Sequence, residues 1–271
     1  MTVVDRAARP RLPNTRHATL SGPELVALAL VALAWVALAA MAVQHALDTS
    51  LTGAHASEAS GMAGMPGMAA ARAAASLSVW SRLISGLPYW LLMTVATMGP
   101  VALAGIRHTG LNSLRWRRGR AVAEFSAGYL AVWAAVGVAA LGAAESTTTL
   151  PREIRLAVVL AGAAAWELSA AKRRASRACH RPLPLPLYGW PAERGALLFG
   201  LRQGASCVGT CWCLMLTMVV VTGAHLLWMA ALTCLIAMER IAGRPRRVSI
   251  ITASGLGAAA VATAVLAALQ G

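Results

Sequence analysis

Long apolar segments separated by short polar ones run along nearly the whole chain. Seven such segments can be delimited, and most approach the ~20 residues that an α-helix needs to cross a bilayer. They cover residues 25–46, 87–106, 121–141, 154–171, 204–225, 226–241 and 249–269. The pattern predicts an all-α protein, a polytopic integral membrane helical bundle with about seven spans.

Composition and charge distribution support this interpretation and orient the chain. Hydrophobic residues make up 58% of the 271, charged residues 13%, and the formal net charge is +14. With the N-terminus inside, the outer loops hold only four of the 24 Lys and Arg residues, namely Arg72, Arg82, Arg152 and Arg155. This asymmetry follows the positive-inside rule, so we expect a multi-pass protein of the plasma (inner) cell membrane, in contact with the lipid bilayer. It also explains the net charge without a nucleic-acid partner.

Soft metal ligands recur within residues 204–225, GASCVGTCWCLMLTMVVVTGAH. If this whole segment is one α-helix, five of them lie on a single face, within about 40° of Cys211. They are Cys207, Cys211, Met215, Met218 and His225. Thiolate, thioether and imidazole groups suit Cu(I) or zinc and suit hard cations poorly. Cys and Met also serve as ordinary packing residues, and that alternative stays open.

The spacing of the two cysteines favours a metal ion over a redox bridge. Residues four apart on a helix have Cβ atoms ~5–6 Å apart, too far for an unstrained disulfide but suitable for two sulfurs around one ion. A third ligand can come from Met98, Met215 or a facing helix. Met93 and Met98 belong to the second apolar segment, where Pro100 predicts a kink and a carbonyl group that needs a new partner.

The longest polar region contains regularly spaced methionines. They are Met62, Met65 and Met68, in the stretch HASEASGMAGMPGM. Gly and Pro at this density argue against a packed element, and thioether sulfurs in a flexible segment can surround a soft ion without losing a proton. We expect a capture arm for metal; a disordered tether is the alternative.

Two carboxylates, Glu124 and Glu167, fall inside apolar segments. An ionisable group within a span is a candidate functional group. Because both lie near arginines or Lys172, pairing or snorkelling is the simpler expectation, and a place at the mouth of a pore is the alternative.

These observations divide the chain into five parts. We expect a cytoplasmic N-terminal tail (1–24), a first span (25–46), a methionine-rich outer loop (47–86), a five-span metal-binding core (87–241) and a last span (248–271). The first apolar run exceeds the roughly 7–15 residues of a signal-peptide core, which favours a retained span. A cleaved signal peptide stays the alternative, because the Ala-rich stretch MAVQHA ends this run.

Several sequence motifs between Trp90 and Glu239 point to a known family. They are WLLMTVATMGP, FSAGYLAVW, GLRQGASCVGTCWCLM and LLWMAAL, and the most specific is Cys207-x-x-x-Cys211-Trp212 with its downstream methionines. This region resembles the bacterial integral membrane proteins of domain of unknown function 2182 (DUF2182), which are often labelled copper chaperones. The resemblance implies copper or another soft metal. Family members often carry a further Cys directly before the second one; here Thr210 stands there, which leaves a pair of thiols.

We therefore expect a membrane copper-binding protein that delivers Cu(I) to a partner cuproprotein and is not an enzyme. In this hypothesis the methionine arm captures the ion, and the ligands on the fifth span form the site or a relay. Zinc is the alternative metal. The chain has no G-x-x-x-x-G-K-[ST] and no Asp-Lys-Thr-Gly motif, which argues against ATP-driven pumping.

Three other functions stay open at this stage. A metal ion transporter would line a pore with the same ligands. A subunit of a membrane copper oxidase would need a His-rich cluster, and only His45 and His225 lie near a span at the predicted outer face. A hydrophobic scaffold would bind no metal at all.

Overall fold

The chain folds into helices throughout the described residues. A computed structural model describes residues 22–58, 79–147, 151–179, 184–186, 188–221, 225–241 and 245–270. Within these ranges it has eight helices and no strand, which confirms the predicted all-α class. The helices are α1 (Gly22–Glu58), α3 (Val79–Leu111), α4 (Arg118–Ser146), α5 (Arg152–Leu168), α6 (Ala170–Cys179), α7 (Gly189–Val220), α8 (His225–Ile241) and α9 (Pro245–Gln270).

Most of these helices have the length and composition of membrane spans. Among the described residues, α1, α3, α4, α7 and α9 are long and apolar enough to cross a bilayer. Helices α5 and α6 pass the same test only as a pair, bent by 67° where they meet, and α8 is a shorter apolar helix. Each of the seven expected segments therefore has a helical counterpart, while the number of crossings and the side facing the cytoplasm stay predictions.

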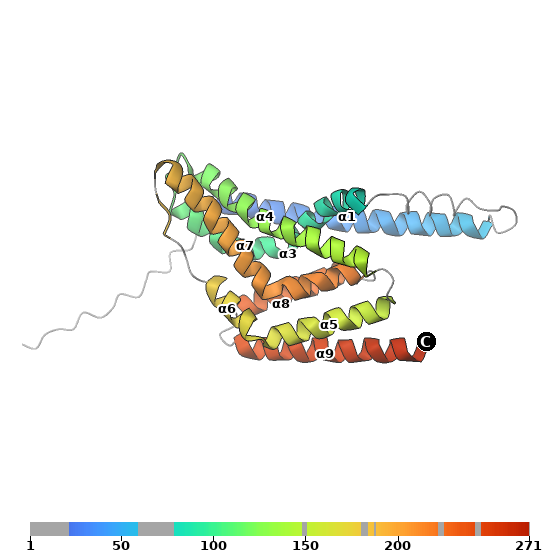
Figure 1. Cartoon of the computed structure of the whole chain (residues 1–271). Coiled ribbons are helices and arrows are strands. Elements are labelled where there is room, and N and C mark those ends of the chain that lie inside the picture. Colours follow the sequence, from blue (N-terminus) through green and yellow to red (C-terminus); the bar gives the residue numbers. More distant parts are fainter. Residues whose placement is uncertain are drawn as a thin grey trace, which may run out of the picture.

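Helix α7 lies between two groups of helices (Figure 1). On one side α1 packs against α3, α3 against α4, and α4 runs along α7. On the other side α5 and α6 contact α7, and α9 lies along α5 (Figure 1). Helix α8 contacts α3, α7 and α9 and so connects the two groups.

The carbonyl group that Pro100 leaves without its helical donor finds a new partner. Proline has no backbone N–H, so the carbonyl oxygen of Ala96, four residues earlier, loses its usual hydrogen bond. The indole Nε1 of Trp35 on α1 donates to this oxygen at 3.0 Å. The expected new partner for the carbonyl group is thus present, the kink at Pro100 stays a prediction, and the bond ties α1 to α3.

Several helix ends differ from the apolar boundaries. Helix α1 continues to Glu58 and α3 begins at Val79, because hydropathy marks the part of a helix that suits a bilayer and not where the helix ends. The expected single segment 154–171 is broken at Ser169, whose backbone is extended (φ −68°, ψ 150°). The Ser169 hydroxyl accepts a hydrogen bond from the Lys172 N–H at 3.0 Å, so it acts as the N-cap of α6.

Candidate metal centre

Small residues bring α4 and α7 into backbone contact. A Cβ atom at Gly200 would overlap the carbonyl group of Phe125, and one at Gly128 would overlap that of Leu197. Interfaces of this kind let two membrane helices approach closely. From Gly200 the positions 204, 207 and 211 advance by four, three and four residues and so share one face of α7. The close approach therefore presents both cysteines to α3 and α4.

Three sulfur atoms meet at this interface. The Sδ of Met98 on α3 lies 3.9 Å from the Sγ of Cys207 and 3.7 Å from the Sγ of Cys211. The exposed fractions of Met98, Cys207 and Cys211 are 0%, 1% and 2%. We call these three residues the sulfur cluster.

Hydrogen bonds hold both thiols in place. The hydroxyl of Tyr129 on α4 donates to the Sγ of Cys207 at 3.1 Å. The Sγ of Cys211 donates to the carbonyl oxygen of Cys207 at 3.0 Å, one helical turn back. The described residues contain no disulfide, in keeping with the poor disulfide geometry of residues four apart on a helix.

The distances from the Met98 sulfur to each of the two thiol sulfurs suit a soft metal ion. An ion placed ~2.3 Å from each of two sulfurs 3.7–3.9 Å apart makes an S–metal–S angle of about 107–116°. This range is close to the tetrahedral angle at its lower end and approaches the trigonal angle at its upper end. Within the described residues no group of three His, Cys, Asp or Glu side chains is arranged to hold a metal, and the third donor beside the two thiols is a thioether. Thioether ligands favour Cu(I).

Two other predicted ligands on α7, Met215 and Met218, are buried as well. Met215 is fully buried, and its Sδ lies 3.9 Å from the hydroxyl oxygen of Thr97, which also donates to the carbonyl group of Met93. Met218 and Met93 are buried as well. Thioethers therefore continue along α3 and α7 from the sulfur cluster.

The expectation of one helix from Gly204 to His225 is wrong. Helix α7 ends at Val220, Val221 has an extended backbone (φ −77°, ψ 112°), and His225 begins α8. The run Val219–Thr222 consists of β-branched residues and Gly223 follows, a combination that disfavours helix continuation. His225 therefore does not share the α7 face with the thiols.

His225 nevertheless lies close to the end of α7. Its Nε2 is 3.2 Å from the carbonyl oxygen of Met218, and its Nδ1 is 3.4 Å from the hydroxyl of Tyr89 on α3. The break in the helix thus brings an imidazole back beside Met218. The methionines of the expected capture arm, Met62, Met65 and Met68, lie outside the described residues.

Analysis of the sequence missed Tyr129 and Thr97 as parts of this region. Both contact predicted ligands. The sequence did contain a signal for them, because a hydroxyl group in the middle of an apolar span needs a buried hydrogen-bond partner. The identity of that partner depends on helix packing, which the sequence does not show.

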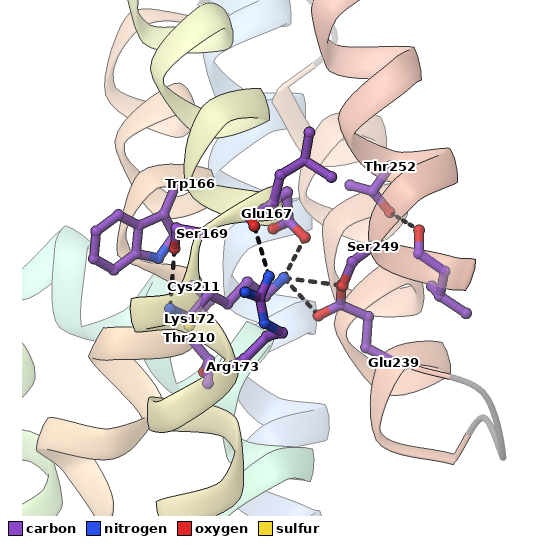
Figure 2. A network of polar contacts seen from close by, with 12 residues as sticks. Trp166, Glu167, Ser169, Lys172, Arg173, Thr210, Cys211, Glu239, Ser249 and Thr252 are labelled. Atoms are coloured by element: carbon purple, nitrogen blue, oxygen red, sulfur yellow. Dashed lines mark hydrogen bonds and ion pairs between the residues drawn. The ribbon is translucent and has the colours of Figure 1, made fainter. Parts of the chain in front are cut away.

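A second buried polar group lies where α5, α6, α8 and α9 meet (Figure 2). The Nζ of Lys172 forms an ion pair with Glu167, and it lies 2.9 Å from both carboxylate oxygens of Glu239. The hydroxyl of Ser249 donates to Glu239 at 3.1 Å. We call these four residues the charge cluster.

Both carboxylates singled out in the apolar segments are paired, as predicted. Glu167 belongs to the charge cluster. Glu124 forms ion pairs with Arg117 and Arg120, both at 3.2 Å. The structure therefore accounts for each of them by a cationic neighbour.

Comparison with known proteins places the chain in a family. The sequence model of the PpoB2 family, described as a copper chaperone, matches residues 87–264. No curated protein and no solved structure matches the chain. The matched region includes the sulfur cluster and the charge cluster, and it covers more than half of the sequence. The chain belongs to the PpoB2 family of copper chaperones.

Proposed function

We propose that this protein binds one Cu(I) ion at the sulfur cluster within a membrane and passes it to a partner cuproprotein. The observation that carries the proposal is the position of the Met98 sulfur, 3.9 and 3.7 Å from the two thiol sulfurs. The family match independently supports a copper-related function.

The donor set explains how such a site holds copper loosely enough to release it. Cys thiolates bind a soft metal strongly, whereas a neutral thioether adds selectivity without adding charge. The hydrogen bond from Tyr129 favours negative charge on the Cys207 sulfur. Ligand exchange with a partner's thiolates or thioethers then replaces one set of soft donors by another.

The remaining predicted ligands suggest a route to the site. Met62, Met65 and Met68 would capture the ion on the predicted outer side, and His225 would receive it. Met218, Met215 and Met93 would then guide it toward the sulfur cluster. This order is supported by the contact between His225 and the Met218 carbonyl group and by the burial of the three methionines.

Replacement of both cysteines tests the binding site. The variant Cys207→Ser/Cys211→Ser should lose its bound Cu(I), falling from about one ion per chain to near zero in a chelator competition assay. Two matched controls replace a cysteine outside the site and should keep their copper. They are Cys213→Ser, also buried on α7, and Cys234→Ser, exposed on α8. A folded double variant that keeps the full copper content would overturn the proposal.

A vesicle assay separates a chaperone from a transporter. Wild-type protein in sealed vesicles should bind copper without net uptake, and it should release copper to a soluble Cu(I)-binding acceptor. Uptake into the lumen that the double cysteine variant abolishes would instead assign the sulfur cluster to a transport path. The same assay repeated with zinc in place of copper tests the alternative metal.

A further inference from the structure

A pocket of about 560 Å³ opens beside the charge cluster. Its walls come from the end of α5, from α6, and from the facing ends of α8 and α9. The polar side chains that line it are Glu167, Lys172, Arg173, Ser176, Arg177, Glu239, Arg246 and Ser249. A volume of this size accommodates a small ligand or the head group of a lipid.

Both carboxylates at this pocket already have a cationic partner within the protein. Glu167 and Glu239 both pair with the Nζ of Lys172, and Glu239 also accepts from Ser249. Among the described residues, Glu167 and Glu239 are the acidic side chains that line the pocket. Three arginines and one lysine against these two carboxylates leave the lining with a net charge of +2, carried by the guanidinium groups.

The three arginines have exposed side chains and no acidic partner within the described parts of the chain. Arg173 donates to the carbonyl group of Leu168 at 2.7 Å, and Arg177 donates through Nε to the carbonyl group of Arg173 at 3.2 Å. Both leave further guanidinium N–H groups for another acceptor. Arg173 and Arg177 lie four residues apart on one face of α6, and Arg246 approaches from the start of α9.

We propose that this pocket binds a phosphate group, held by Arg173, Arg177 and Arg246. Guanidinium groups match the geometry of phosphate oxygens and bind them through paired N–H donors. The pocket lies at the ends of apolar helices and on the predicted cytoplasmic side, where basic pockets bind anionic lipid head groups. The phosphate can come from such a head group or from a soluble anion, and both present the same oxygens to the arginines.

The test uses the full-length protein purified in a neutral detergent, titrated with phosphatidylglycerol and separately with inorganic phosphate. Native mass spectrometry counts retained lipid, and calorimetry measures phosphate binding. The wild type should bind phosphatidylglycerol saturably and phosphatidylcholine weakly. The variant Arg173→Gln/Arg177→Gln/Arg246→Gln should bind phosphatidylglycerol at least tenfold more weakly. Arg115→Gln, an exposed arginine on the same predicted side but outside the pocket, should bind like the wild type.

A second variant is needed because loss of the hydrogen bond from Arg173 to the Leu168 carbonyl group could disturb the bend between α5 and α6. Arg177→Gln/Arg246→Gln keeps the hydrogen bond from Arg173 to Leu168 and should still weaken binding severalfold. If inorganic phosphate binds at the same arginines and displaces the lipid, the ligand is a soluble phosphate; if only the lipid binds, it is the head group.

Two results would overturn the proposal. One is a wild type that shows neither a preference for phosphatidylglycerol nor phosphate binding; the other is a folded triple variant that binds as tightly as the wild type. The site does not depend on copper, so Cys207→Ser/Cys211→Ser should retain full phosphatidylglycerol binding. That control keeps failure of this proposal distinct from failure of copper binding.

Discussion

The sulfur cluster and the charge cluster lie on different sides of α7. They differ in how their buried polar groups are paired. In the charge cluster, both carboxylates contact the Lys172 ammonium group, so each has a cationic partner within the protein and needs no ligand. In the sulfur cluster, thiol, thioether and phenol groups make weak contacts with one another and contribute no opposite charge. The charge cluster is therefore suited to hold helices together, and the sulfur cluster is suited to accept a soft cation.

Removal of the central cation should give the largest effect on stability. Lys172→Met would leave two carboxylates facing each other in a largely buried site, and breaking a buried ion pair in this way costs about 3–5 kcal/mol. We expect a loss of this size in the free energy of unfolding, measured by denaturant titration in detergent micelles. Lys172→Met/Glu167→Gln should recover part of it. A single variant within about 1 kcal/mol of the wild type would contradict a structural role for the charge cluster.

Separation of α4 from α7 should disturb the sulfur cluster from a distance. Gly200→Ala would place a methyl group against the Phe125 carbonyl and force the helices apart, which typically costs about 1–3 kcal/mol. Because Tyr129 and Cys207 lie across the same interface, we expect Cu(I) affinity to fall roughly tenfold, as a loss of ~1.4 kcal/mol would produce.

A glycine with open space around it provides the control for that change. Gly162→Ala on α5 would meet no atom within 4 Å, so stability and copper affinity should stay near wild type. If Gly200→Ala binds copper as tightly as Gly162→Ala does, close approach of α4 and α7 does not position the thiols.

Sequence patterns predicted the helices better than they predicted the contacts of the site. Apolar segments revealed the long helices of the core but not α6, whose sequence is basic. The four-residue spacing of Cys207 and Cys211 revealed that they share a face, because helical spacing is local geometry. The N-cap at Ser169 and the end of α7 at Val220 were missed, since a single cap or a β-branched run hardly changes hydropathy. Pairing of Glu167 near Lys172 was expected, but the contact of Lys172 with Glu239 was missed because the two residues are 67 positions apart.

The proposal of Met98 as the third ligand also required the structure. Met98 and Met215 were equally plausible from the sequence, and only the packing of α3 on α7 places the sulfur of Met98 beside both thiols. Met215 instead contacts Thr97. Distant residues meet through tertiary packing, which spacing along one helix does not encode.

Loss of the thioether should weaken copper binding while leaving the fold nearly unchanged. Leu has a volume close to that of Met, so Met98→Leu should cost less than about 1.5 kcal/mol of stability. Removal of the third donor should lower Cu(I) affinity by roughly tenfold, which corresponds to ~1.4 kcal/mol. Met229→Leu on α8, also fully buried and outside the proposed copper route, is the matched control and should change affinity little. Equal affinities for the two variants would remove Met98 from the site.

The smallest effect should come from single hydrogen bonds that reach α7 from its two sides. Tyr129 donates to the Cys207 sulfur from α4, and the indole of Trp166 donates to the Gly209 carbonyl group from α5 at 3.1 Å. Tyr129→Phe and Trp166→Phe each remove one such bond, at a cost of about 1 kcal/mol. Both should therefore lower the unfolding midpoint slightly, but only Tyr129→Phe should reduce Cu(I) affinity, by a fewfold. If both reduce it equally, the binding depends on how firmly α7 is held and not on the contact with the thiol.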